Sequence, residues 1–387
     1  MKRITAAILT FGLHAAIAQT VANVYVQTSA GVFVYEASKS GSLTALKGSP
    51  FSTSGQLEGV TGHYLISVGT DYIHVYSIES NGAVGKQISE INTQDYGGSE
   101  CGNTTGNGAV LDHTGKYFYV QLNSYNECAA WQTYKLEANG RLEFLNDFEY
   151  YSTADGTVIS STVPTTSGND SFAYGVFPNP DGPNGNTFSA FAISKNGDMQ
   201  QNQNFTEQDP LVNPAQTGYY YRPELVEADP FGHLAVLVTD SSVDTYNQGQ
   251  LASYTIDETT GGIKSTNTWK NMPYPFVAYP TSMNMSTSGK FLAVGATATE
   301  GAAFLGLQIF NFKGAAPLTP LTGWLLNGTS IDRFKWDQDD HLYALDYTTG
   351  ALYVFTVTSN GAHEAATSPT SIPYAPYGSL GMAVVSK

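Results

Sequence analysis

A short strand-like line recurs along the chain and restricts the folds open to it. In residues 73–84 (IHVYSIESNGAV), apolar Ile73, Val75 and Ile78 are interleaved with polar residues, a pattern that favours a strand over a helix. Asn81-Gly82 then predicts a tight hairpin turn, because both residues tolerate positive φ angles. The central aromatic residue of the line returns at Tyr35, Tyr76, Tyr134, Phe191, Tyr254, Phe310 and Phe355. These positions indicate seven repeats.

A second register lies upstream of the first in most repeats. It consists of a turn, then Lys or His, then an apolar strand, as in Gly115-Lys116-Tyr117-Phe118 and Gly289-Lys290-Phe291-Leu292. Units of about 40–60 residues that contain several strands are typical of propeller blades. We therefore predict an all-β chain folded as a seven-bladed β-propeller of four-stranded antiparallel blades. His63, His233 and His341 occupy the turn of this register, where we expect solvated side chains.

The two ends of the chain are expected to complete one blade together. The N-terminal piece has only three predicted strands, Val24–Gln27, Val32–Ala37 and Leu43–Leu46. A spare strand, Leu380–Ser386, follows the seventh blade. If the spare strand is innermost in the first blade, the ring closes and no sheet edge is left exposed at the junction. Residues 19–387 are then a single domain.

The first residues are typical of a secretory signal peptide. Lys2-Arg3 is followed by a largely apolar run, and Ala16-Ile17-Ala18 offers a cleavage site before Gln19. We predict that residues 1–18 are removed and that the mature chain is secreted or periplasmic. The only two cysteines, Cys101 and Cys128, would form a disulfide in such an oxidising compartment.

The charge and the spacing of ligand-type residues exclude several classes of partner. The formal net charge is −16, and an acidic surface repels both nucleic acid and anionic lipid. We therefore expect no nucleic-acid partner and no membrane partner. No His/Cys spacing typical of zinc occurs, and the Asx-rich stretches do not match an EF-hand, so we predict no metal and no cofactor. We expect a monomer.

The long connections are expected on one face of the ring, which we call the top face. It is formed by the connections between blades and the loops that join the second and third strands of each blade. Connections of this length tend to carry function. They occupy Asp95–Gly106, Glu149–Gly156, Phe205–Tyr221 and Lys270–Tyr279.

Charged residues open several of the predicted innermost strands, where they could face the channel. An Arg beside carboxylates could hold an anionic substrate and activate water. The same charges could instead pair with one another and tie blades together. Candidates are Glu58, Arg222, Glu224, Asp332 and Arg333. Tyrosines predicted on the top face could bind a sugar or an aromatic ligand, or could pack between blades. They include Tyr221, Tyr279 and Tyr377.

The repeats resemble the seven-bladed propellers of the lactonase family, whose best-known activity is that of 6-phosphogluconolactonase, and the related YVTN-repeat surface proteins. The resemblance is carried by GKYFYV at 115–120, GKFLAV at 289–294 and GSPF at 48–51. It implies a catalytic Pro-Arg-His opening one innermost strand. In the matching register this chain has Pro223-Glu224-Leu225, followed by Asp229-Pro230-Phe231-Gly232, and no blade that we can align has the histidine.

Two hypotheses about function follow. In the first, the propeller is an exported scaffold that binds a small molecule, a glycan or a protein through its top face, as the missing Pro-Arg-His pattern favours. In the second, the resemblance implies a lactonase-type carboxylic ester hydrolase that acts on a lactone or sugar-derived cyclic ester in the central channel. Its catalytic residues would be Arg222, Glu224 and Arg333. Glu58, Asp332, Tyr221, Tyr279 and Tyr377 would bind the ligand.

Overall fold

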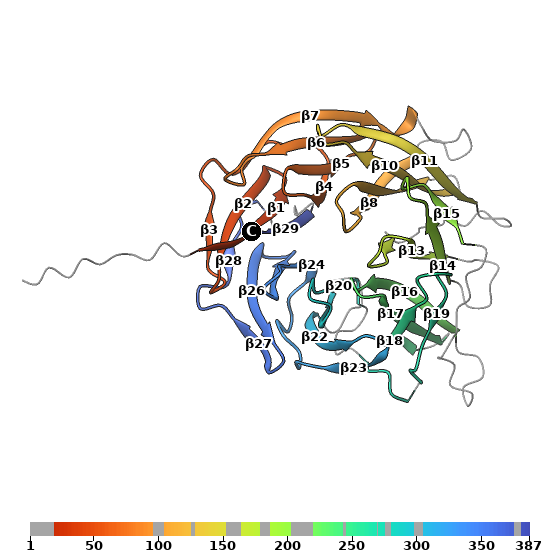
Figure 1. Cartoon of the computed structure of the whole chain (residues 1–387). Helices are drawn as coiled ribbons and strands as arrows, with labels where there is room; N and C mark the ends of the chain where they lie inside the picture. The colour runs from red at the N-terminus through yellow and green to blue at the C-terminus, as the bar shows by residue number, and fades with distance from the viewer. Residues whose placement is uncertain are drawn as a thin grey trace, which may run out of the picture.

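Seven antiparallel sheets stand around a common axis in the computed structural model (Figure 1). The sheets are built from the described residues, and each contains at least four strands. The structure describes residues 19–95, 104–124, 128–151, 164–178, 186–202, 220–242, 245–268, 270–274, 280–297, 305–374 and 381–387. The predicted all-β, seven-bladed propeller is therefore confirmed.

The strands of each blade run outward from the axis, and blades are numbered along the chain. Blade 1 contains β29 (Gly381–Ser386), β1 (Thr20–Thr28), β2 (Gly31–Ser38) and β3 (Leu43–Ala45). Blade 2 contains β4 (Gln56–Val60), β5 (Tyr64–Val68), β6 (Tyr72–Ile78) and β7 (Val84–Asn92). Blade 3 contains β8 (Thr104–Leu111), β9 (Tyr117–Ser124), β10 (Cys128–Leu136) and β11 (Leu142–Tyr151). A short 3-10 helix, η1 (Thr93–Asp95), follows β7.

The remaining four blades repeat this order. Blade 4 contains β12 (Thr165–Thr166), β13 (Phe172–Pro178), β14 (Asn186–Ile193) and β15 (Met199–Gln201). Blade 5 contains β16 (Tyr220–Ala228), β17 (His233–Ser242), β18 (Thr245–Ile256) and β19 (Ile263–Lys264). Blade 6 contains β20 (Ser282–Met285), β21 (Phe291–Ala296), β22 (Gly306–Lys313) and β23 (Ala316–Pro320). Blade 7 contains β24 (Ile331–Trp336), β25 (His341–Asp346), β26 (Ala351–Thr358) and β27 (Gly361–Glu364), with β28 (Thr370–Ser371) also paired to β26.

The last strand of the chain closes the ring, as predicted. β29 is innermost in blade 1 and pairs antiparallel with β1, in a register that sets Val24 opposite Val384. In Figure 1 the two ends of the described chain meet in this blade. The edge of β1 is thereby covered by β29 rather than left free to pair with another chain.

The hydrophobic core lies between the blades. Each sheet is sandwiched between two others, so its middle strands are buried on both faces; all six residues of β21 and all six of β25 are buried. Five apolar clusters each join two consecutive blades, from blades 1 and 2 to blades 5 and 6, and a sixth joins blades 6, 7 and 1. Burial on both faces explains the near-continuous apolar runs in these strands.

The seven repeat aromatic residues mark one structural position. Each lies in the third strand of its blade, and each is at most 5% exposed. The aromatic register therefore counts the blades correctly. These rings pack across blade boundaries; for example, the centroids of Trp131 in blade 3 and Phe191 in blade 4 lie 4.4 Å apart. Pairs at such a separation add directional packing to the area that they bury.

In six of the seven blades, the glycine that follows the third strand closes a turn against the neighbouring blade; the glycine of blade 7, Gly361, has open space around it. Gly197 in blade 4 has a φ of +89°, and a Cβ there would lie 2.2 Å from Tyr117 Cδ1 of blade 3. The Tyr117 hydroxyl donates a hydrogen bond to the Lys195 carbonyl oxygen of this turn at 3.2 Å. Glycine is thus required both by the backbone conformation and by the close approach of the previous blade.

One turn histidine contradicts the expectation of a solvated side chain. His63 is exposed, but His341 is only 2% exposed. Its Nδ1 lies 2.8 Å from Asp337 Oδ2, and its Nε2 lies 3.2 Å from the Lys39 carbonyl oxygen of blade 1. The expectation was wrong because blade 1 covers this turn of blade 7. The hydrogen bond that His341 donates to the Asp337 carboxylate raises the pKa of His341 above its usual value, despite the opposing effect of burial.

Among the described residues, no helix is long and apolar enough to cross a membrane.

Candidate functional site

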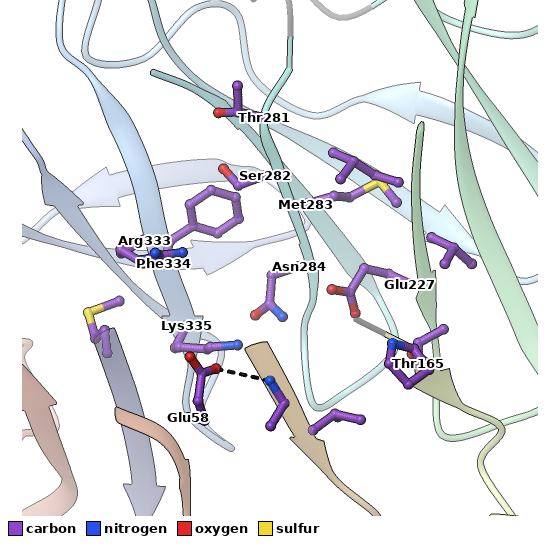
Figure 2. A pocket seen from close by; sticks show the side chains of 16 residues that line it. Glu58, Thr165, Glu227, Thr281, Ser282, Met283, Asn284, Arg333, Phe334 and Lys335 are labelled. Carbon is purple, nitrogen blue, oxygen red and sulfur yellow. Dashed lines mark hydrogen bonds between the residues drawn. The ribbon is translucent and has the colours of Figure 1, made fainter. Parts of the chain in front are cut away.

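A cavity of about 400 Å³ lies at the axis of the ring, and every innermost strand contributes to its wall. Its polar lining residues converge from five blades, while apolar side chains fill much of the rest of the wall (Figure 2). The described lining residues are Glu58, Ala109, Val110, Pro164, Thr165, Leu225, Val226, Glu227, Thr281, Ser282, Met283, Asn284, Arg333, Phe334, Lys335 and Met382. A concave site with a few converging polar groups is the usual form of a small-molecule site.

A β-bulge brings Glu58 to this cavity. On β4, Leu57 pairs with Ser67 and Gly59 pairs with Ile66, so Glu58 is the extra residue between them. Bulges of this kind redirect a side chain and are frequent beside active sites. β16 and β24 carry bulges as well, with Glu224 and Asp332 as the extra residues.

The Glu58 carboxylate is held by two donors. The Gln56 amide donates to Oε1 at 2.6 Å, and the backbone N–H of Ala109, on β8, donates to Oε2 at 3.3 Å. Burial raises the pKa of Glu58 to about 7, against the opposing effects of Arg333, of these hydrogen bonds and of Lys335. A carboxyl group with this pKa exchanges its proton near neutral pH.

Glu227, on β16, is a second carboxyl group of the same kind. Burial raises its pKa to about 7, while the charge of Lys335, the Asn284 side chain and the Met285 backbone N–H lower it. In Figure 2 the Asn284 amide lies between Glu227 and the group formed by Lys335 and Glu58. Two carboxyl groups from blades 2 and 5 therefore share one cavity and one neighbouring cation.

Both cations among the described lining residues come from one strand. Arg333 and Lys335 are separated by one residue on β24, so both side chains leave the same face of the strand. Phe334, between them, is buried in the core and also lines the cavity. Two carboxyl groups and two cations thus line a cavity whose wall is otherwise uncharged among the described residues.

The structure brings together only part of the predicted site. Glu58 and Arg333 both line the cavity. Glu224 occupies the bulge of β16 and is not among the lining residues, although the next residue, Leu225, does line the cavity. Arg222, Tyr221 and Asp332 lie in β16 and β24, but their side chains are outside the described part, and Tyr279 and Tyr377 lie outside the described residues altogether. Their roles stay predictions.

Sequence reasoning missed Glu227, Lys335 and Asn284. A usable signal was present, because each of these residues stands two positions before the polar residue that opens the turn to the second strand. The turn residues are Asp229, Asp337 and Ser286, respectively. Thr165 stands in the same position before Ser167 and also lines the cavity. This register position faces the axis in four blades.

The predicted disulfide lies outside what the structure describes, because Cys101 and the side chain of Cys128 are not described. Within the described ranges, no group of three or more His, Cys, Asp or Glu side chains is arranged to hold a metal ion. The prediction of no metal and no cofactor is not tested by this observation.

Comparison with known proteins supports the fold. No protein-family model and no curated protein sequence matches the chain. Three solved structures resemble it over 95% of its length: a protein from Lactobacillus plantarum (TM-score 0.62, 14% identity, 100% of that chain), a provisionally assigned 6-phosphogluconolactonase from Bacteroides fragilis (0.61, 12%, 98%) and a periplasmic gluconolactonase from Pseudomonas aeruginosa (0.60, 14%, 99%). The chain shares the seven-bladed propeller fold of these lactonase-type structures.

Proposed function

We propose that the chain is a hydrolase that opens a small lactone, such as a sugar-derived cyclic ester, in the central cavity. One observation supports this choice above the others: two carboxyl groups with a pKa of about 7 line the same cavity as Arg333 and Lys335. A general base is most effective when its pKa lies near the working pH. The likeness to a gluconolactonase structure at 14% identity supports the substrate class only by analogy.

Glu227 is the general base in this proposal. Its carboxylate takes a proton from a water molecule as the water oxygen bonds to the lactone carbonyl carbon. Arg333 and Lys335 stabilise the oxyanion that forms on the carbonyl oxygen. When the ring C–O bond breaks, protonated Glu227 returns its proton to the departing alkoxide oxygen. The product is an open-chain hydroxy acid.

Asn284 and the Met285 backbone N–H hold Glu227 in position, since both donate hydrogen bonds to its carboxylate. Glu58 faces the two cations and balances their charge between turnovers. The apolar part of the wall, including Leu225, Met283 and Met382, suits the C–H faces of a sugar ring.

The test is hydrolysis of D-glucono-δ-lactone by the purified mature chain, followed by acid release. We expect Glu227→Gln to lower kcat by about 100-fold or more, the usual contribution of a general base. Glu364→Gln, an exposed glutamate on β27, is the matched control and should keep the parent rate. No turnover by the parent chain, or full activity in Glu227→Gln, would refute the proposal.

A binding scaffold is the second candidate, and one observation favours it. No histidine occurs among the described residues that line the cavity, which agrees with the absence of Pro-Arg-His in the sequence. In that case the parent chain binds a sugar-derived ligand without turnover. Saturable binding together with no acid release would select the scaffold over the enzyme.

The proposal includes export of the chain, for which the basic and apolar start of the sequence is the support. N-terminal sequencing of the secreted product tests it, with Gln19 expected as the first residue. The monomeric state, and the lack of nucleic-acid and membrane partners, stay predictions from composition. Binding at the top face also stays a prediction.

A further inference from the structure

The charged groups of the central cavity are distributed unevenly around the ring. β4 contributes Glu58, β16 contributes Glu227, and β24 contributes both Arg333 and Lys335. The described lining residues of β8, β12, β20 and β29 are uncharged. Among the described lining residues, two positive groups therefore face at most two negative ones, and these four groups are neutral in sum only when both glutamates are ionised.

We propose that the cavity binds a small carboxylate anion between Arg333 and Lys335, and that Glu58 takes up a proton when the anion binds. This inference rests on the proposed function in that the central cavity is the ligand site. It goes further by naming the group that is recognised and a dependence on pH that hydrolysis alone does not require.

The charge balance gives the physical reason. An added carboxylate beside two ionised glutamates leaves the cavity with one excess negative charge, which is unfavourable where solvent screening is weak. Protonation of one glutamate restores neutrality. Because Glu58 and Glu227 both titrate near neutral pH, the proton is available there without a large free-energy penalty.

The surroundings of the two glutamates select Glu58 as the proton acceptor. Both Arg333 and Lys335 lower the pKa of Glu58, whereas Lys335 is the cation that lowers the pKa of Glu227. A carboxylate ligand that pairs with the two cations weakens their attraction for Glu58 more than for Glu227. The pKa of Glu58 therefore rises more on binding.

The experiment is isothermal titration calorimetry of the mature chain with D-gluconate, and with sorbitol, which replaces the carboxylate by an alcohol. Titrations at pH 7.5 in phosphate and in Tris, which differ in ionisation enthalpy, give the number of protons taken up. We expect about half a proton or more per gluconate, and an affinity that falls by up to about tenfold per pH unit above pH 7. Sorbitol should bind much more weakly.

Variants assign the proton. Glu58→Gln should bind gluconate with no proton uptake and with little dependence on pH, whereas Glu364→Gln should behave as the parent. The proposal is overturned if the observed heat of gluconate binding to the parent, with only the heat of dilution subtracted, is the same in both buffers. It is also overturned if sorbitol binds as tightly as gluconate, or if gluconate does not bind at millimolar concentration.

These outcomes are separable from those of the lactone assay. A chain that takes up a proton with gluconate but hydrolyses no lactone supports this inference and rejects the hydrolase. A chain that hydrolyses lactone but binds gluconate without a proton rejects this inference alone.

Discussion

Replacement of Glu227 by Gln should stabilise the protein at alkaline pH while it removes activity. The folded chain holds this carboxyl group at a pKa of about 7, whereas an unfolded chain lets it ionise with the ordinary value of 4.5. Between these values the folded state binds more protons than the unfolded state. The free energy of unfolding therefore falls as the pH rises through this interval, and the loss is complete only above pH 7.

The size of the effect follows from the two pKa values. A difference of roughly 2.5 pKa units corresponds to about 3 kcal/mol at high pH. At pH 5 little of this penalty is present, so the change between pH 5 and pH 8.5 is about 2–3 kcal/mol. Glutamine does not ionise and has no such penalty. It does present an N–H₂ group where the carboxylate accepted a hydrogen bond from Asn284 or Met285, which costs about 1 kcal/mol at either pH.

The measurement is urea unfolding of the parent and of Glu227→Gln at pH 5 and at pH 8.5, with Glu364→Gln as the exposed control. We expect the variant to gain about 2 kcal/mol relative to the parent on going from the lower to the higher pH. The constant hydrogen-bond penalty cancels in this difference. A gain of less than a few tenths of a kcal/mol would mean that Glu227 is not held in a poorly solvated cavity, and the reasoning about the site would fail.

Three further predictions concern the ring itself. Gly197→Ala should destabilise the fold by roughly 2–4 kcal/mol in urea unfolding, because its Cβ would overlap Tyr117 and its φ is positive; Gly328→Ala, with positive φ but open space, should lose only about 1–2 kcal/mol. Deletion of β29 should abolish cooperative thermal unfolding, since it uncovers β1, and an unchanged Tm would refute the closure. His341→Gln should destabilise more at pH 5.5 than at pH 8.5, because the pKa of His341 is higher in the folded chain than in the unfolded chain. The stabilisation that His341 contributes is therefore fully present below the unfolded pKa and is lost as the pH rises above the folded pKa. Equal losses of stability at both pH values would contradict this.

The blade count could be predicted from the sequence because local physics repeats at each copy. The third-strand aromatic residue is buried in all seven blades, and each copy needs a turn whose glycine accepts positive φ. Each requirement involves only the same blade and the blade next to it in the ring, so it repeats at every copy. The spare strand at the C-terminus could also be recognised, since a blade with three strands leaves an unpaired edge.

The site was less predictable because its geometry depends on the bulges. One extra residue in β4, β16 and β24 changes which side chains face the axis. Glu58 and Arg333 were found because they are charged residues near the start of inner strands. Glu227 and Lys335 were missed because they stand near the ends of β16 and β24, where charged side chains next to a turn usually face solvent.

The burial of His341 illustrates the same limit. Its sequence context matches that of exposed His63, and only the packing of blade 1 over blade 7 distinguishes them.

The sequence by itself determined the all-β class, the seven blades and the pairing of the two chain ends, because strand periodicity, turn chemistry and edge pairing act within or between neighbouring segments. Only the tertiary structure decided the charge balance of the central cavity. Glu58, Glu227 and the cations of β24 lie far apart in the sequence, and their shared desolvation exists only once the ring has closed around them.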